Sequence, residues 1–322
     1  MPRPPSDPRP YYRSLAPLLL WQEVERPVDW TRVFGRTAPL ALEIGTGNGE
    51  FLARTAVEHP QRDHVGAELR WASVKRALRN LAKAGAANAR MVIEDARPVV
   101  ERMFAPRALE RVYLLFPCPW TKARHERHRL LHRRFLELLN SRLVDGGEAL
   151  LVTDWTPYLE WTVAQAEGTG LRIEVREHEP RWNTKYERKW SSLGRRRFHE
   201  MRMIKESHRD APAPEDVPMN PPHLARFDPD AFAPQDLIGP TTITFKEVVR
   251  DRERGVVMVR TVVVEETLTQ HFWITIARAG DGSWWVVAAR GCATIPTVGV
   301  QLALERVAEG ARPRDPGRAA GS

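Results

Sequence analysis

The sequence predicts an α/β protein whose main part is a doubly wound parallel sheet, followed by a smaller C-terminal α+β appendage. Between about residues 39 and 205, apolar runs of strand length alternate with amphipathic stretches of helical period, which is typical of strands joined by crossover helices. A turn with three alternating glycines follows the first apolar run. Residues 210–240 are rich in proline, which indicates a linker before four further strand-like runs.

Five apolar runs are expected to form the successive strands of the main sheet, at residues 40–44, 64–67, 90–93, 112–116 and 149–152. Amphipathic helices are expected at residues 72–84 and 133–143, the second stopped by Asp145-Gly146-Gly147. Right-handed crossovers place the carboxyl ends of such strands along one edge of the sheet. We therefore expect any ligand to bind at that edge.

The C-terminal part is expected to form strands at residues 241–245, 255–264, 271–277 and 283–288, with a hairpin turn at residues 280–282. Val300, Ala303, Leu304 and Val307 share one face of a closing helix. The expected division of the chain is a flexible N-terminal arm (1–30), the α/β domain (31–210), a proline-rich linker (211–240), an α+β module of unknown role (241–310) and a disordered tail (311–322).

Composition limits the classes of partner and of compartment. The chain has 322 residues, with 49 Lys and Arg against 41 Asp and Glu, and a pI near 9.8, which favours a polyanionic partner. Its two cysteines, Cys118 and Cys292, are too few for a disulfide framework or a cysteine-based zinc cluster and suit a reducing compartment. Neither a signal peptide nor a bilayer-spanning run is evident, so we expect a cytoplasmic protein that does not bind membranes.

The turn from Gly45 to Gly49 indicates a nucleotide or nucleoside site, because its glycines let backbone amides and a helix N-terminus approach a ligand. A dinucleotide is the obvious alternative. Its phosphate fingerprint requires a glycine three residues after Gly47, and that position is Glu50, whose carboxylate would meet a pyrophosphate badly. The Gly-x-Gly-x-Gly spacing after Glu43 instead resembles the first motif of class I methyltransferases. Their cofactor, S-adenosylmethionine, carries positive charges and no phosphate.

Two further acids end successive predicted strands. Glu68 ends the second strand, where a carboxylate can accept hydrogen bonds from both ribose hydroxyls of a nucleoside. Asp95 ends the third strand, where it or the adjacent backbone can accept a hydrogen bond from an adenine amino group. Any one such acid is ordinarily a solvated loop residue or a helix cap. Their succession beside the glycine turn favours a cofactor site.

The fourth predicted strand ends at two prolines and continues directly into a basic segment. Pro117 and Pro119 lack amide hydrogens, so they end the strand and hold Cys118 and Trp120 at its carboxyl end. A solvated basic face is the usual interpretation of such a segment. Its position at the strand end instead favours contacts with the phosphates of a nucleic acid. The residues concerned are Arg124, His125, Arg127, His128, Arg129, His132, Arg133 and Arg134.

Six blocks of sequence occur together and in order. They are residues 42–49, Gly66-Ala67-Glu68, Glu94-Asp95-Ala96, residues 116–125 (Phe-Pro-Cys-Pro-Trp-Thr-Lys-Ala-Arg-His), Thr153-Asp154-Trp155 and Thr184-Lys185-Tyr186-Glu187. In this combination the chain strongly resembles the bacterial tRNA (guanine-N7-)-methyltransferases over roughly residues 30–205. The resemblance implies a Rossmann-like domain that transfers a methyl group from S-adenosylmethionine to N7 of guanine 46 in the tRNA variable loop.

The resemblance also implies roles for single residues. Cofactor contacts fall on Glu43, Gly45, Gly47, Gly49, Glu68, Asp95 and position 118. Substrate contacts fall on Lys122, Arg124, His125, Asp154, Thr184, Lys185, Tyr186 and Glu187. The family has an aspartate between the two prolines, assigned to cofactor contact and catalysis, where this chain has Cys118. Because a neutral thiol is a poor acceptor, we expect a slower enzyme, or one that depends on Asp154 and Glu187.

Guanine N7 carries an in-plane lone pair and no proton, so its methylation depends on alignment rather than on a general base. A covalent role for Cys118 is the more exotic alternative, because N7 has no need of one. His125, His128 and His132 do not indicate a metal site, since the surrounding arginines would repel a cation. Two other functions stay open: a class I methyltransferase acting on another substrate, and a tRNA-binding protein with weakened catalysis.

Overall fold

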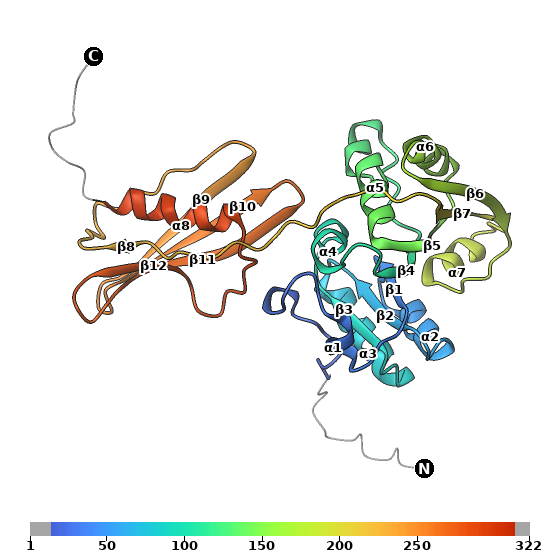
Figure 1. Cartoon of the computed structure of the whole chain (residues 1–322), viewed down its shortest axis with the longest axis horizontal. Helices are drawn as coiled ribbons and strands as arrows, with labels where there is room; N and C mark the ends of the chain where they lie inside the picture. The colour runs from blue at the N-terminus through green and yellow to red at the C-terminus, as the bar shows by residue number, and fades with distance from the viewer. Residues whose placement is uncertain (1–13, 313–322) are drawn as a thin grey trace, which may run out of the picture. The chain divides into compact units, whose positions relative to one another are not determined.

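The computed structural model describes residues 14–312, and the chain divides into two compact units, Met1–Pro214 and Glu215–Ser322 (Figure 1). The predictions for residues 1–13 and 313–322 lie outside the described residues. Each unit has its own sheet and its own hydrophobic core.

The first unit is built on a seven-stranded sheet with the order β3-β2-β1-β4-β5-β7-β6. Strands β1 to β5 run parallel, whereas β7 is antiparallel to both of its neighbours. The predicted doubly wound class is confirmed, and two strands follow the five that the sequence predicted. The bounds are β1 (Leu40–Ile44), β2 (Asp63–Ala67), β3 (Ala89–Val92), β4 (Leu109–Leu115), β5 (Leu143–Thr153), β6 (Leu171–His178) and β7 (Phe198–Lys205).

Helices pack in two groups against this sheet. On α3 (Trp71–Ala84), the apolar residues Val74, Ala77, Leu78 and Leu81 follow helical spacing and are buried against α2 (Glu50–Glu58) and β3. On the other side, α5 (Arg133–Arg142) contacts both α4 (Ala96–Met103) and α6 (Thr156–Ala166). Right-handed crossovers place the two groups of helices on opposite faces of the sheet. The reason is that the strands are added toward one edge from β1 to β3 and toward the other edge from β4 onward. Shorter elements are η1 (Trp21–Glu23), α1 (Trp30–Phe34), η2 (Ala123–His128) and α7 (Lys185–Ser192).

The strand order reverses between β1 and β4. In doubly wound sheets, ligands bind outside the carboxyl ends of the strands at such a switch point. The glycine turn follows β1 and the Pro-Cys-Pro segment follows β4, so both lie at this point. The fold therefore brings together two motifs that are about 70 residues apart in the sequence.

The prediction that Asp145-Gly146-Gly147 stops a helix is wrong in its detail. Helix α5 ends at Arg142, and β5 begins at Leu143 and runs through these three residues. Gly146 has φ +74°, and a side chain on Gly147 would come within 2.9 Å of the Val144 carbonyl oxygen. The glycines therefore allow an irregularity near the start of a long strand, where the pairing of β4 with β5 also shifts register.

Part of the predicted N-terminal arm packs on the first unit. Leu18 forms an isolated parallel bridge with Met91 of β3, and Trp21 is buried. Val28 donates its backbone N–H to the Met103 carbonyl oxygen at the end of α4. Residues 18–28 therefore extend the core of this unit.

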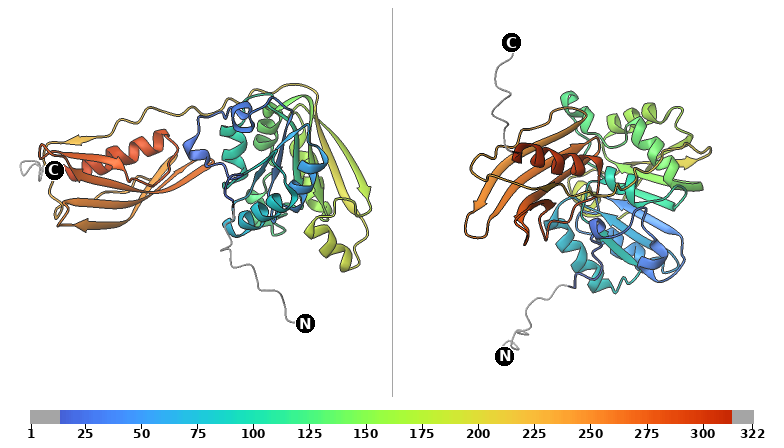
Figure 2. Two further views of the ribbon diagram at one scale, coloured as in Figure 1. Left: turned by 90° about the horizontal axis from the view of Figure 1, so that it is seen from below. Right: turned by 60° about the vertical axis from the view of Figure 1, so that its left-hand side comes forward.

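The second unit is a five-stranded antiparallel sheet, β8-β12-β11-β10-β9, with α8 (Val298–Ala311) across one face (Figure 2). The predicted α+β module is confirmed. Its β8 (His223–Leu224), together with the core residue Phe232, comes from the stretch predicted as a linker. Glu265 accepts hydrogen bonds from the Thr297 hydroxyl and the Gly299 amide, which fixes the start of α8. The other strands are β9 (Thr241–Asp251), β10 (Val256–Glu265), β11 (Leu268–Arg278) and β12 (Trp284–Ala288).

Candidate active site

The backbone of the glycine turn allows a ligand to come close to it. Gly45, Gly47 and Gly49 all have positive φ, of 73°, 57° and 71°. Gly49 is the N-cap of α2, and a Cβ there would lie 2.5 Å from Ala77 of α3, so only glycine permits this packing. Around Gly45 and Gly47 no described atom lies within 4 Å of an added Cβ, which leaves this side of the turn open to a ligand.

Glu68 holds the glycine turn from the end of β2. Its Oε2 accepts the Gly47 amide at 2.9 Å, and its Oε1 accepts the Arg70 amide at 2.9 Å. Asp95, three residues after the end of β3, is the N-cap of α4, and its Oδ1 accepts the Arg97 amide at 3.0 Å. Both acids thus have structural bonds as well as the strand-end positions that the sequence predicted.

Glu43 is a buried carboxyl in β1, next to the turn. Burial raises its pKa to about 8, with the positive charge of Arg54 opposing this shift and the charge of Glu68 adding to it. Among the described residues, neither its Oε2 nor the buried Thr46 Oγ1 has a hydrogen-bond partner. Buried polar atoms normally have one, so these two atoms suit contacts with a bound molecule.

The segment after β4 is held in a tight, unusual turn. Phe116 and Trp120 have positive φ values of 54° and 46°, which non-glycine residues rarely adopt. Cys118 lies between them and is exposed. The ring of Phe116 packs edge-on against Phe198 of β7, at a centroid distance of 5.5 Å. The turn therefore presents the thiol at the switch point of the sheet.

The basic segment after this turn is mostly exposed, with one exception. Lys122 and Arg124 are exposed, and His125 is half-buried, with its Nε2 accepting a 3.2 Å hydrogen bond from the Arg124 Nε. Arg129 is only 6% exposed, and its Nε donates to the Pro119 carbonyl oxygen. The interpretation of Arg129 as a phosphate contact is wrong, because tertiary packing buries its guanidinium group.

Asp154 follows β5 and is half-buried. Arg195 approaches it from the chain after α7: its Nη1 donates to the Asp154 carbonyl oxygen at 2.5 Å, and its Nε lies 3.8 Å from Oδ2. The carboxylate therefore has a cationic neighbour while part of its surface stays accessible. Trp155 comes next and is half-buried.

The Thr184–Glu187 motif divides into two structural and two accessible residues. Glu187 is 1% exposed, and its carboxylate accepts the backbone amides of Arg181 at 3.0 Å and Asn183 at 2.5 Å. Thr184 is the N-cap of α7 and accepts the Glu187 amide at 3.1 Å. Lys185 and Tyr186 are exposed, Tyr186 to 48%. The fold thus uses Thr184 and Glu187 to shape the loop that presents the other two.

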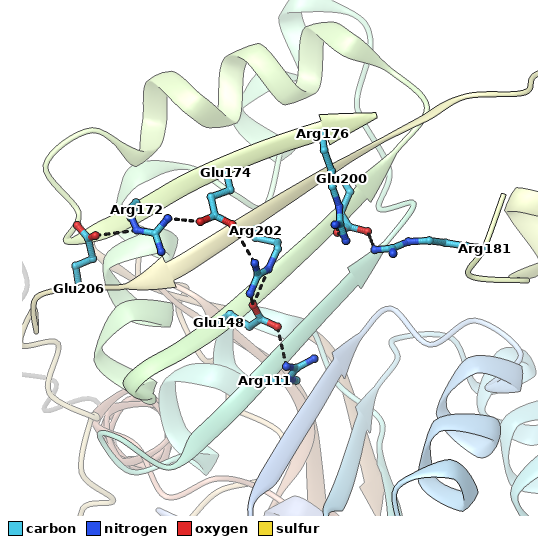
Figure 3. Close-up of polar contacts among 9 residues, drawn as sticks. All are labelled: Arg111, Glu148, Arg172, Glu174, Arg176, Arg181, Glu200, Arg202 and Glu206. Atoms are coloured by element: carbon cyan, nitrogen blue, oxygen red, sulfur yellow. Dashed lines mark hydrogen bonds and ion pairs between the residues drawn. The ribbon is translucent and has the colours of Figure 1, made fainter. Parts of the chain in front are cut away.

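Contacts from two elements anchor this loop. From α2, Arg54 donates to the Trp182 carbonyl oxygen, and Glu50 pairs with Arg188 at 2.5 Å. From β7, the buried Glu200 accepts hydrogen bonds from Arg176 and from Arg181 (Figure 3). Hydrogen bonding to Arg188 lowers the pKa of Glu50. The loop and the start of α7 are therefore held by α2 and by β7.

These elements enclose one small cavity of about 40 Å³. It lies between the glycine turn and the loop before α7. Its lining comprises Glu43, Gly45, Thr46, Gly47, Asn48, Glu50, Phe51, Leu115, Thr184, Lys185 and Tyr186. Of the predicted site residues, Gly49, Glu68, Asp95, Cys118, Lys122, Arg124, His125, Asp154 and Glu187 lie outside this lining. Ligand pockets commonly measure about 300–1,000 Å³, so this cavity is smaller than a typical ligand pocket.

The residues present fit a cationic nucleoside. A positive charge next to Glu43 would favour its ionised form, and the open side of Gly45 and Gly47 admits close backbone contact. Within residues 14–312, no group of three or more His, Cys, Asp or Glu side chains is arranged to hold a metal ion. No helix of the described part of the chain is long and apolar enough to cross a membrane.

Sequence reasoning missed two of the residues that hold the site together, Arg54 and Glu200. One signal was available: Arg54 follows Glu50 by four residues on α2, so the two share a helix face. A second was Glu200, a carboxylate two positions after the buried Phe198 on a strand. Neither signal identifies its partner, because the partners lie far away in the sequence.

Comparisons with known proteins identify the family of this chain. A family model described as "Putative methyltransferase" matches residues 37–200. A tRNA (guanine-N(7)-)-methyltransferase of Thermus thermophilus is 37% identical over 280 residues, covering 82% of this chain and 86% of the relative. One of Deinococcus radiodurans is 35% identical over 301 residues, covering 88% and 92%.

Other matches are shorter. A tRNA (guanine-N(7)-)-methyltransferase of Thermotoga maritima is 38% identical over 175 residues, which is 53% of this chain and 56% of the relative. Among solved structures, the 16S rRNA methyltransferase KamB has a TM-score of 0.44 and 16% identity, covering 56% of this chain and 93% of its own. A score at that level adds nothing to the assignment.

Proposed function

The chain belongs to the tRNA (guanine-N7-)-methyltransferase family and is an enzyme of that activity; from this premise we propose that S-adenosylmethionine is its methyl donor and guanine 46 of the variable loop its target. The observation that carries the proposal is the cavity at the switch point. There the glycine turn, the buried Glu43 and the accessible half of the Thr184–Glu187 motif meet.

We assign cofactor binding to the residues around the glycine turn. Glu43 lines the cavity, and its carboxyl Oε2 has no hydrogen-bond partner among the described residues. A carboxyl group at this place suits the positive charge of the methyl donor. Glu68 and Asp95 stand at the ends of β2 and β3, where ribose and adenine would follow along the sheet edge. When bound, S-adenosylmethionine supplies an electrophilic methyl group on a sulfonium.

We assign tRNA binding to the exposed residues around the same edge. Lys122, Arg124 and Lys185 offer positive charge to phosphates, and Tyr186 offers an exposed ring on which a base can stack. Asp154 offers a carboxylate that can accept from N1 and N2 of guanine. These contacts would orient N7 without removing any proton, since its lone pair is already free.

The test is mass spectrometry of nucleosides from unmodified tRNA incubated with the full chain and S-adenosylmethionine. We expect N7-methylguanosine to form at a single position of the variable loop. A tRNA transcript with guanine 46 replaced by adenine is the control and should gain no methyl group. Methylation of another nucleoside, or of another guanine in the control transcript, would refute the assignment of the target.

A further inference from the structure

Arg129 stands apart from the other basic residues of its segment. It directly follows η2, and its side chain is 7% exposed although the three preceding residues, Glu126, Arg127 and His128, are exposed. Burying an arginine costs free energy unless its donors find acceptors. Its surroundings therefore indicate a structural purpose.

The guanidinium group bonds to the turn that carries Cys118. Its Nε donates to the Pro119 carbonyl oxygen at 3.2 Å, and its Nη2 lies 3.5 Å from the Trp120 carbonyl oxygen. Pro117 and Pro119 have no amide hydrogen, and Trp120 is in the left-handed backbone region. A turn of this kind persists only where surrounding contacts fix it. Arg129 supplies such contacts.

The same group also contacts Trp155, which follows β5, and Trp161 of α6. Its Nη1 pairs with Glu126 at 3.1 Å, and Glu126 in turn accepts the Trp161 indole N–H at 2.9 Å. The guanidinium carbon lies 5.4 Å from the ring of Trp155 and 5.0 Å from that of Trp161. Trp155 directly follows Asp154. Arg129 thus links the turn after β4 to the residues after β5.

Only arginine can make these contacts at once. The guanidinium is planar and carries five donors, so it can lie against indole rings while donating in three directions. A lysine would keep the charge but lose the planar fork. A charge-preserving substitution therefore separates the geometry of the group from its charge.

We propose that Arg129 is a positioning residue for methyl transfer, which fixes the Pro119–Trp120 turn, and with it Cys118, against Asp154 and Trp155. It acts through backbone carbonyls and not through the tRNA phosphates. This inference rests on the proposed function, because the turn has to be aligned with a reacting base. Misplacing reacting groups by about 1 Å can cost about a hundredfold in rate.

The first test compares Arg129→Lys with the wild type in the full chain. We expect kcat to fall by about ten- to a hundredfold, with the Kd for tRNA and its dependence on salt unchanged. Arg79→Lys, the same change at an exposed position of α3, should keep the wild-type kcat. A wild-type kcat in Arg129→Lys would overturn the proposal. So would a loss confined to tRNA affinity, with the slope of log K against log salt reduced by about one, because that result marks a phosphate contact.

The second test does not depend on activity. In a Cys292→Ser background, the exposed Cys118 is the single remaining thiol, and its rate of alkylation by iodoacetamide reports on the turn. We expect Arg129→Lys to raise this rate several-fold and Arg79→Lys to leave it unchanged. Equal rates in Arg129→Lys and in the parent would refute the inference. Absence of methyl transfer by the wild type would instead refute the proposed function and leave this measurement intact.

A third variant protects the test against a folding failure of Arg129→Lys. Glu126 has a side chain that is 48% exposed, and Glu126→Gln weakens the same set of contacts from its solvent side. We expect a smaller change in the same direction: a two- to fivefold lower kcat and faster alkylation of Cys118. A Glu126→Gln protein equal to the wild type in both measurements would contradict the proposal.

Discussion

Cys118 lies in an exposed turn at the carboxyl end of β4, at the position where the resemblance to the family implies an aspartate. A carboxylate there would stabilise the positive charge that develops on the purine during methylation, whereas a neutral thiol does so poorly. We expect Cys118→Asp to raise kcat by about tenfold in a methylation assay with tRNA. Cys118→Asn is the matched control and should gain nothing, because it adds the size without the charge. An aspartate variant no faster than the wild type would show that this enzyme has no need of that charge.

Glu43 makes the stability of the protein depend on pH. Burial raises its pKa to about 8 from 4.5, so the folded state keeps a proton that the unfolded chain releases. The stability from this proton is present below about pH 4.5 and is lost as the pH rises to about 8. Burial also lowers the pKa of His64 to about 4 from 6.5. The contribution of His64 to stability therefore rises with pH between about pH 4 and 6.5, opposite to that of Glu43. Of these two groups, only Glu43 acts between about pH 6.5 and 8.

We therefore expect the free energy of unfolding to fall across that window by on the order of 1 kcal/mol per pH unit. Glu43→Gln should remove this slope, because glutamine does not titrate. Urea unfolding of both proteins at several pH values in the window measures it. Parallel slopes in the two proteins would show that another group is responsible.

The loop between β6 and α7 leads into Thr184, Lys185 and Tyr186, which line the small cavity beside the glycine turn. Glu200 is 1% exposed and binds both Arg176 and Arg181, whereas Glu174 on β6 is 41% exposed and pairs with Arg172 and Arg202 (Figure 3). Exposed ion pairs contribute little to stability, and buried ones are costly to break. The two glutamates therefore form a matched pair for mutation.

We expect Glu200→Gln to lower kcat/KM by about tenfold and the free energy of unfolding by about 1–3 kcal/mol, because the loop loses its anchor on β7. Glu174→Gln should stay within about 0.5 kcal/mol of the wild type and keep its activity. Steady-state kinetics and urea unfolding give both quantities. Equal effects of the two substitutions would show that the loop does not depend on Glu200.

At the scale of elements, the sequence predicted best where the signal is local. The helix at Trp71–Ala84 and the strand at Leu40–Ile44 carry clear periods, and both were predicted to within a residue at each end. The start of β5 was not predicted. Gly146 and Gly147 are residues that commonly end a helix, and only the pairing of β5 with β4 makes them part of a strand. The two strands after β5 were also missed, since their charged residues hide an alternating pattern.

At the scale of the whole molecule, charge is divided unequally between the two units. Residues 14–214 contain 34 Lys and Arg against 26 Asp and Glu, whereas residues 215–312 contain 10 against 13. Binding to tRNA depends on neutralising phosphates, so the first unit should supply most of the affinity. Each unit also has its own buried core, which favours independent folding.

A chain that ends at Pro214 should therefore fold, methylate tRNA and bind it within about threefold of the full chain, with the same salt dependence. Filter binding over a range of salt concentrations, together with the methylation assay, measures both properties. A large loss of affinity with a shallower salt slope would place phosphate contacts in the second unit. A loss of affinity at an unchanged slope would instead indicate uncharged contacts there.

The sequence by itself determined the fold class, the order of the motifs along the sheet edge and the family. Hydrophobic periodicity and the backbone effects of glycine and proline depend on local sequence, so they can be recognised without knowing which residues meet in the fold. Tertiary structure decided which charged residues are free to act. Arg129 and Glu187 look like ligand-binding residues in the sequence, yet the fold buries both and uses them to hold turns. For Arg129 that choice depends on Trp155 and Trp161, which the fold brings close in space, because burial of a charge is decided by such neighbours rather than by the residue itself.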